Sequence, residues 1–159
     1  MISSRKSRGR PSATTTIDDG RNRQINLNYA LAPTLAIHRQ QLMLQVSILS
    51  QDGPVIARLA GLVSLEAWDQ ALRELNAAIS GSRSDRLLVD LGGLVGWLGV
   101  PERKAVGALM ATHLAQMRKV ALVIQAEKIT GVVQAEAQKG GLDLRLFSSR
   151  DDAMSWVVS

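Results

Sequence analysis

Hydrophobic residues stand at every second position in the stretch that precedes residues 51–54, which read Gln-Asp-Gly-Pro. The alternating residues are Leu42, Leu44, Val46 and Ile48. This period is typical of a strand with one buried face. Residues 55–60 are again mostly aliphatic and predict a second strand. Because the turn between the two stretches is short, we expect an antiparallel hairpin.

After the hairpin the hydrophobic spacing changes to that of a helix. Apolar residues recur at helical intervals, namely Leu65, Trp68, Leu72, Leu75 and Ile79. Ser64 stands directly before them and can cap the first turn, and Gly81 stands near the expected end. The pattern predicts a helix that packs this apolar side, with Trp68, against a sheet.

The next apolar run is the centre of the predicted fold. Leu87, Leu88 and Val89 are consecutive, as in a strand that is buried on both faces. We expect this strand to end at Asp90 and a glycine-rich connector, Leu91 to Val100, to follow it. Pro101 suits the first turn of the next helix. The apolar face of that helix carries Val106, Leu109, Met110, Leu114 and Met117.

The remaining sequence alternates between short apolar runs and helical patterns. Residues 120–124 predict an inner strand, and residues 129–140 predict a short helix. Leucines at every second position predict a last strand over residues 142–146, after which Ser149 opens a last helix. The order β-β-α-β-α-β-α-β-α predicts a single α/β domain over residues 35–159, with a mixed, mostly parallel sheet.

The basic charge of the chain is concentrated at its start. The net charge is +5, and residues 1–23 contribute +4 of it, with six basic residues against two acidic ones. We expect residues 1–25 to be a disordered basic arm with weak, non-specific affinity for polyanions, and residues 26–34 to be a linker or edge segment. The rest of the chain is nearly neutral, so no broad nucleic-acid surface is expected.

The sequence lacks the residues that several classes of function require. The chain has no cysteine, and its histidines, His38 and His113, stand far apart, so we expect no metal site. The connector glycines match neither the dinucleotide fingerprint nor the phosphate-binding loop, so we expect no cofactor and no enzyme activity. We interpret His113, on an apolar helix face, as a satisfied half-buried residue. No apolar run is long enough to span a bilayer, and we expect a cytoplasmic protein.

Short pieces of the chain, taken in order, carry a family resemblance. They are Ala60-Gly61-Leu62, Arg86 to Leu91, Gly96-Trp97, residues 118–123 and residues 152–156. This series resembles the STAS domain, the fold of anti-sigma-factor antagonists, and more closely its bacterial STAS-like or CRAL-TRIO-like branch. The resemblance implies a regulatory module that works by binding proteins.

The sequence departs from that family at the expected site of regulatory phosphorylation. In STAS antagonists, a serine or threonine that follows an aspartate opens the helix after the central strand. Leu98 and Gly99 stand at the corresponding place here, and no serine or threonine occurs from Leu87 to Ala111. We therefore do not expect the phosphorylation switch in this chain.

The connector is the candidate site for a protein partner, which is either an unknown regulator or a second copy of the chain. Its apolar residues are Leu94, Val95, Trp97, Leu98 and Val100. Loops ordinarily lie at the surface, where apolar groups often mark a contact. The same residues are equally consistent with closing the hydrophobic core.

A second hypothesis is the carriage of a small, lipid-like apolar ligand, which the CRAL-TRIO-like resemblance implies. Met110, Leu114 and Met117 would line its pocket, because their side chains adapt to irregular shapes. Core packing explains these residues as well.

Overall fold

A computed structural model of the chain describes residues 43–159. The predicted basic arm (residues 1–25), the linker or edge segment (26–34) and the proposed start of the domain at residue 35 lie outside these described residues.

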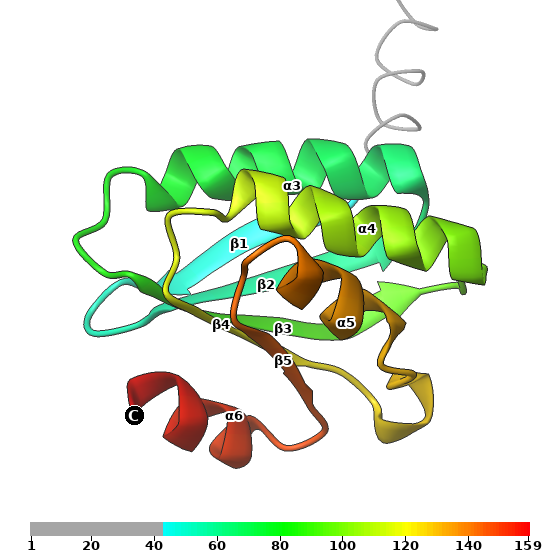
Figure 1. The fold of residues 1–159 in the computed structure, drawn as a ribbon. Coiled ribbons are helices and arrows are strands. Elements are labelled where there is room, and N and C mark those ends of the chain that lie inside the picture. The colour runs from blue at the N-terminus through cyan, green and yellow to red at the C-terminus, as the bar shows by residue number, and fades with distance from the viewer. Residues whose placement is uncertain (1–42) are drawn as a thin grey trace, which may run out of the picture. The chain divides into compact units, whose positions relative to one another are not determined.

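The described residues form one five-stranded sheet in the order β1-β2-β3-β4-β5 (Figure 1). Strand β1 (Gln45–Ser50) pairs antiparallel with β2 (Val55–Leu62), which confirms the predicted hairpin. Strands β2, β3 (Arg86–Val95), β4 (Lys119–Val123) and β5 (Leu144–Phe147) are parallel neighbours. The predicted mixed α/β fold and its element order are therefore confirmed.

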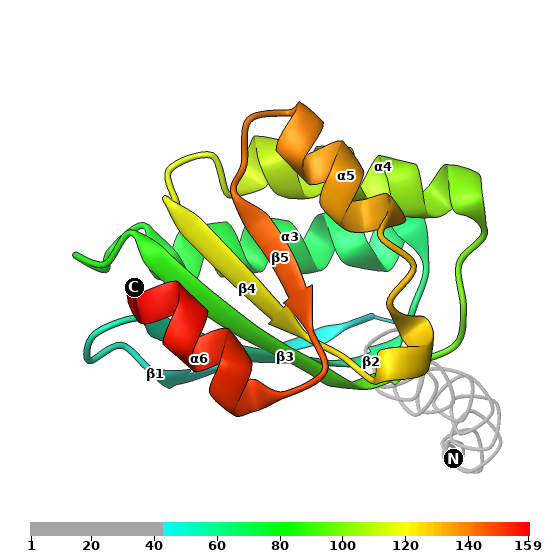
Figure 2. The ribbon, with the colours of Figure 1, turned by 60° about the horizontal axis from the view of Figure 1, so that its bottom comes forward.

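Helices cover the two faces of the sheet unequally. Helices α3 (Leu65–Ile79), α4 (Val100–His113) and α5 (Val132–Lys139) lie on one face, and α6 (Arg150–Val158) lies alone on the other (Figure 2). A short 3₁₀ turn, η1 (Ala126–Lys128), connects β4 to the segment that leads into α5.

Two predicted helix caps are present. The Ser64 hydroxyl accepts the Ala67 N–H at 3.0 Å, and the Ser149 hydroxyl accepts the Asp152 N–H at 3.3 Å. Both bonds satisfy backbone donors that a helix start otherwise leaves unpaired. Helix α4 differs, because its N-cap is Gly99, which has no side chain to cap it.

The hydrophobic core has two parts, one on each side of the sheet. Leu87 and Val89 point into the larger cluster under α3, α4 and α5, while Leu88 joins a small cluster under α6. These residues are almost completely buried, which confirms that the central strand is covered on both faces.

The predicted end of the central strand at Asp90 is wrong. Strand β3 continues to Val95, because its second half stays paired with β2 after a shift of register. Gly93 lies opposite Ala60, and a Cβ on Gly93 would approach the Ala60 Cβ to 2.8 Å. The glycine therefore permits close strand pairing here, and the true connector is only residues 96–99.

Candidate functional site

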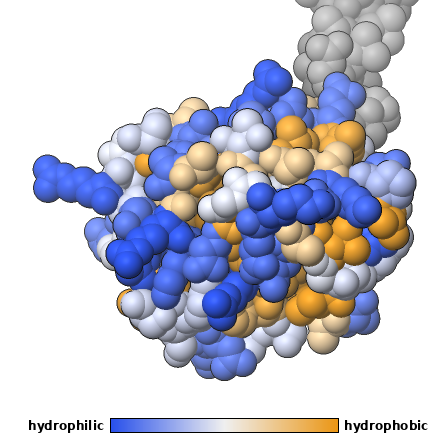
Figure 3. Space-filling model, viewed as in Figure 1, coloured by the Kyte–Doolittle hydropathy of each residue, from blue (hydrophilic) through white to orange (hydrophobic). Residues whose placement is uncertain are grey.

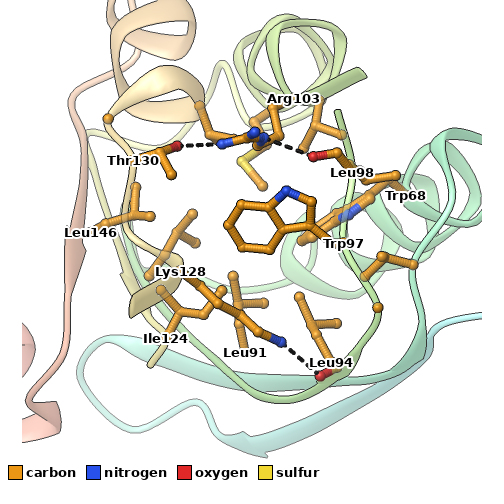
Figure 4. Close-up of a pocket in the computed structure, with 17 residues that line it drawn as sticks. Trp68, Leu91, Leu94, Trp97, Leu98, Arg103, Ile124, Lys128, Thr130 and Leu146 are labelled. Carbon is orange, nitrogen blue, oxygen red and sulfur yellow. Dashed lines mark hydrogen bonds between the residues drawn. The ribbon is translucent and has the colours of Figure 1, made fainter. Parts of the chain in front are cut away.

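An apolar cavity of about 80 Å³ lies at the carboxyl ends of the parallel strands, beside α4 (Figure 4). This is the end of an α/β sheet at which binding sites collect. Helix α4 contributes Val106 and Met110 to its wall. The sheet contributes Leu91, Leu94, Leu122 and Leu146, and Ile124 follows the end of β4.

Trp97 lies across the mouth of this cavity. Its side chain is half exposed, at 54%, and the Arg103 guanidinium lies 4.7 Å from the ring centroid. The turn before Trp97 is closely packed. Gly96 has a φ of +103°, and a Cβ at this position would lie 3.2 Å from a methyl group of Val63. Backbone packing and a cation–π contact thus place the indole over an apolar space.

Arg103 connects the connector to the segment that precedes α5. Its Nε donates to the Leu98 carbonyl at 2.9 Å, and its Nη1 donates to the Thr130 hydroxyl at 2.8 Å. Arg103, Thr130 and Lys128 all line the cavity, and Lys128 Nζ donates to the Leu94 carbonyl at 3.4 Å.

These polar groups were not predicted from the sequence. Arg103 and Thr130 are 27 positions apart, and only the packing of α4 beside the start of α5 brings them together. No regular spacing or motif in the sequence marks such a pair.

The predicted partner-binding residues occupy different environments. Val95 (60% exposed), Trp97 and Val100 present apolar surface to solvent. Leu98 is half-buried against the core, and Leu94 is buried at 8% exposure, as part of the cavity wall.

The exposed surface also includes two residues that the sequence analysis did not select. Leu62 is the register partner of Val95 in the β2–β3 ladder, and Leu65 begins α3; both are exposed. We call the resulting set the end patch. It consists of Leu62, Leu65, Val95, Trp97 and Val100.

The residues predicted to line a ligand pocket separate in the structure. Met110 lines the cavity, but Leu114 and Met117 are buried in the main core and are not part of the cavity wall. Trp68, expected in the core, is buried and also borders the cavity.

The remaining ionisable residues of interest form structural contacts. His113 Nε2 lies 3.0 Å from Asp69 Oδ1, so α4 is tied to α3 and the histidine is half-buried and satisfied, as expected. This hydrogen bond is the main cause that lowers the pKa of Asp69; Arg73 adds to the effect, and desolvation opposes it. Asp90 accepts the Gly92 N–H at 2.9 Å and pairs with Arg58.

Neither a metal-binding cluster nor a membrane-spanning helix is found among residues 43–159. No group of acidic and histidine side chains there is arranged to hold a metal ion. None of the helices in this range is both long and apolar enough to cross a membrane.

The fold is that of a known class of small α/β proteins. The sequence model of the SpoIIAA-like family matches residues 55–158, so the chain belongs to the SpoIIAA-like family. No match was found among curated proteins.

Two solved structures show the same fold. One is an uncharacterized protein with a SpoIIAA-like fold from Shewanella loihica, at 21% identity and TM-score 0.50, with 72% of this chain and 94% of that chain covered. The other is an anti-sigma factor antagonist from Mycobacterium paratuberculosis, at 17% identity and TM-score 0.50, with 73% and 95% covered.

Proposed function

We propose that this chain is a non-catalytic STAS-like regulatory module that binds a protein partner through the end patch. The observation that carries the proposal is the patch itself, in which apolar side chains from β2, β3, α3, α4 and the connector are exposed at one end of the sheet. The SpoIIAA-like fold supports a regulatory, protein-binding role.

The end patch has the features of a protein contact. Exposed aliphatic and aromatic side chains that gather at one end of a sheet often mark a contact with another protein. Trp97 would be the main anchor, because tryptophan is enriched among the residues that dominate binding energy. The surrounding strands and helices hold these side chains in place, so little order needs to be gained on binding.

Orange, hydrophobic residues are visible beside blue, hydrophilic ones on the right-hand side of the view in Figure 3. An apolar centre with a polar rim is the usual composition of an interface between proteins.

Regulation by phosphorylation at the start of α4 is not part of this proposal. The α4 N-cap is Gly99, and no serine or threonine occurs from Leu87 to Ala111. A phosphate would interact strongly with the backbone N–H groups at this helix start, but there is no hydroxyl to carry it.

The carriage of a lipid-like ligand has less support. A cavity of about 80 Å³ is smaller than the roughly 150 Å³ cavity that holds one benzene molecule. The long acyl chain of a lipid therefore does not fit beside Met110 without a large rearrangement. The CRAL-TRIO-like resemblance stays an expectation from the sequence.

The proposal is tested by capturing partners from the native host with wild-type protein and two variants. Trp97→Ala removes the exposed indole, and Val158→Ala is a matched control, because Val158 on α6 is equally exposed at 54%. We expect Trp97→Ala to reduce the captured partner by about tenfold and Val158→Ala to leave it unchanged.

Circular dichroism and melting temperature establish that each variant is folded. Equal capture by wild type and folded Trp97→Ala would contradict the proposal. Analytical ultracentrifugation of the same proteins shows whether the partner is a second copy.

A further inference from the structure

We propose that the cavity behind Trp97 binds a small organic anion, namely a carboxylate with a short branched aliphatic chain. Arg103 and Thr130 would hold the carboxylate, and the cavity would hold the chain. This inference goes beyond partner binding and does not rest on it.

The size and wall of the cavity define the apolar part of the ligand. About 80 Å³ of space, surrounded mainly by leucine, isoleucine, valine and methionine side chains, suits a branched group of a few carbon atoms. Such a space is unfavourable for water, because water needs polar partners on several sides. A short hydrocarbon group would bury its surface there without displacing well-bound water.

The polar groups at the mouth provide donors for an anion. The Thr130 hydroxyl already accepts a hydrogen bond from Arg103, so its own hydrogen is available to donate. Arg103 uses one N–H for Leu98 and one for Thr130, which leaves further N–H groups of its guanidinium available. Arginine binds carboxylates in a two-pronged geometry that combines charge with direction.

The two cations at the mouth form no close ion pair within the described part of the chain. Among residues 43–159, no carboxylate lies within 4.0 Å of Arg103 or Lys128, although six other ion pairs are present. Lys128 runs past the other side of the Trp97 ring in Figure 4 and adds positive potential at the same opening. An anionic group would therefore meet two cations that form no ion pair within 4.0 Å.

Trp97 lies at the mouth of the cavity and would respond to occupancy. Its ring rests against the Arg103 guanidinium, which is the group that would bind the carboxylate. A bound anion would compete with the indole for this cation, so the environment of the Trp97 indole N–H should change on binding.

The test is an NMR titration of the full ¹⁵N-labelled chain with 3-methylbutanoate. We expect saturable shifts at the Trp97 indole and at the Thr130 and Gly131 amides, with a Kd of about 1 mM. Acetate has the charge without the chain, and 3-methylbutan-1-ol has the chain without the charge. Each is expected to bind about tenfold more weakly.

Variants separate the two halves of the site. Arg103→Gln is expected to weaken binding about tenfold, and Thr130→Val, at an exposed position, about threefold. Val133→Phe fills the cavity and should abolish binding of the branched chain. Lys104→Gln, on the adjacent exposed position of α4, is the control that should bind as wild type.

Absence of saturable shifts at Trp97 and Thr130 in the wild-type protein would overturn the inference. Unchanged affinity in both Thr130→Val and Val133→Phe would also overturn it. The titration contains no partner protein, so its failure leaves the partner-binding proposal standing, and the capture experiment can fail while this one succeeds.

Discussion

At the scale of single residues, Arg103 has contacts with more than one part of the molecule. Arg103 belongs to α4. Its guanidinium donates to the Leu98 carbonyl in the connector and to the Thr130 hydroxyl before α5, and it packs on the Trp97 ring. Its role is therefore to fix the connector relative to α4 and the α5 segment. The position of Trp97 in the end patch therefore depends in part on the Arg103 side chain.

Replacement of Arg103 by alanine should destabilise the protein by about 1–2 kcal/mol, because two hydrogen bonds and a cation–π contact are lost at a partly exposed site. Urea unfolding measures this change. Lys104→Ala removes a similar charge from the next position, which is exposed, and should change the free energy of unfolding by no more than about 0.5 kcal/mol. Equal effects of the two substitutions would show that the Arg103 contacts contribute little.

At the scale of elements, the pairing of β2 with the second half of β3 determines where the connector and Trp97 lie. The sequence-based prediction ended β3 at Asp90, because glycines usually interrupt a strand. The structure continues it, since Gly93 allows the backbone of β3 to pass close to Ala60. This distinction depends on a neighbouring strand and is not contained in the local pattern.

Substitution of Gly93 by alanine tests this close approach. The added methyl group would meet the Ala60 Cβ at 2.8 Å, so we expect a loss of about 1–3 kcal/mol in the free energy of unfolding. Gly81→Ala is the matched control, because a Cβ at Gly81 has no atom within 4 Å. A folded Gly93→Ala protein of wild-type stability would mean that β2 and β3 separate easily at this end.

The contact between α3 and α4 predicts a pH dependence. The pKa of Asp69 is lowered below its ordinary value of 3.8, first by the hydrogen bond from His113. A carboxylate with a lowered folded-state pKa stabilises the protein above its unfolded-state pKa, and this contribution is lost as the pH falls through the folded-state pKa.

The melting temperature of wild type should therefore exceed that of Asp69→Asn at neutral pH. The difference should begin to shrink as the pH falls below about 4 and should be lost as the pH falls through the lowered pKa of Asp69. Thermal scans of both proteins from neutral to acidic pH measure it. A difference that stays constant over this range would contradict the ionic contribution of Asp69.

At the scale of the whole molecule, the fold was predictable and the site was only partly so. Alternation, helical spacing and the caps at Ser64 and Ser149 are local signals, and they gave the correct order of strands and helices. The cavity depends on Arg103 and Thr130, which only the three-dimensional packing brings together. The exposure of Val95 beside the burial of Leu94 likewise depends on which side of β3 the helices cover.

The charge distribution gives a prediction for the intact chain. Residues 1–23 hold +4 of the net charge of +5, so their removal should lower binding to heparin or DNA at low salt. Deletion of residues 1–25 should leave the melting temperature nearly unchanged. Binding of the intact chain should also weaken steeply as salt is added. Tight, salt-resistant binding by the truncated protein would contradict this assignment of the charge.

The most direct test of the end patch is hydrogen–deuterium exchange of the intact chain with and without the partner captured by wild-type protein. We predict that exchange slows at residues 62–65 and 95–103, where the end patch and Arg103 lie, and stays unchanged along α6, residues 150–158. Protection of α6 with no change at the end patch would place the partner at α6, away from the end patch, and contradict the proposed interface.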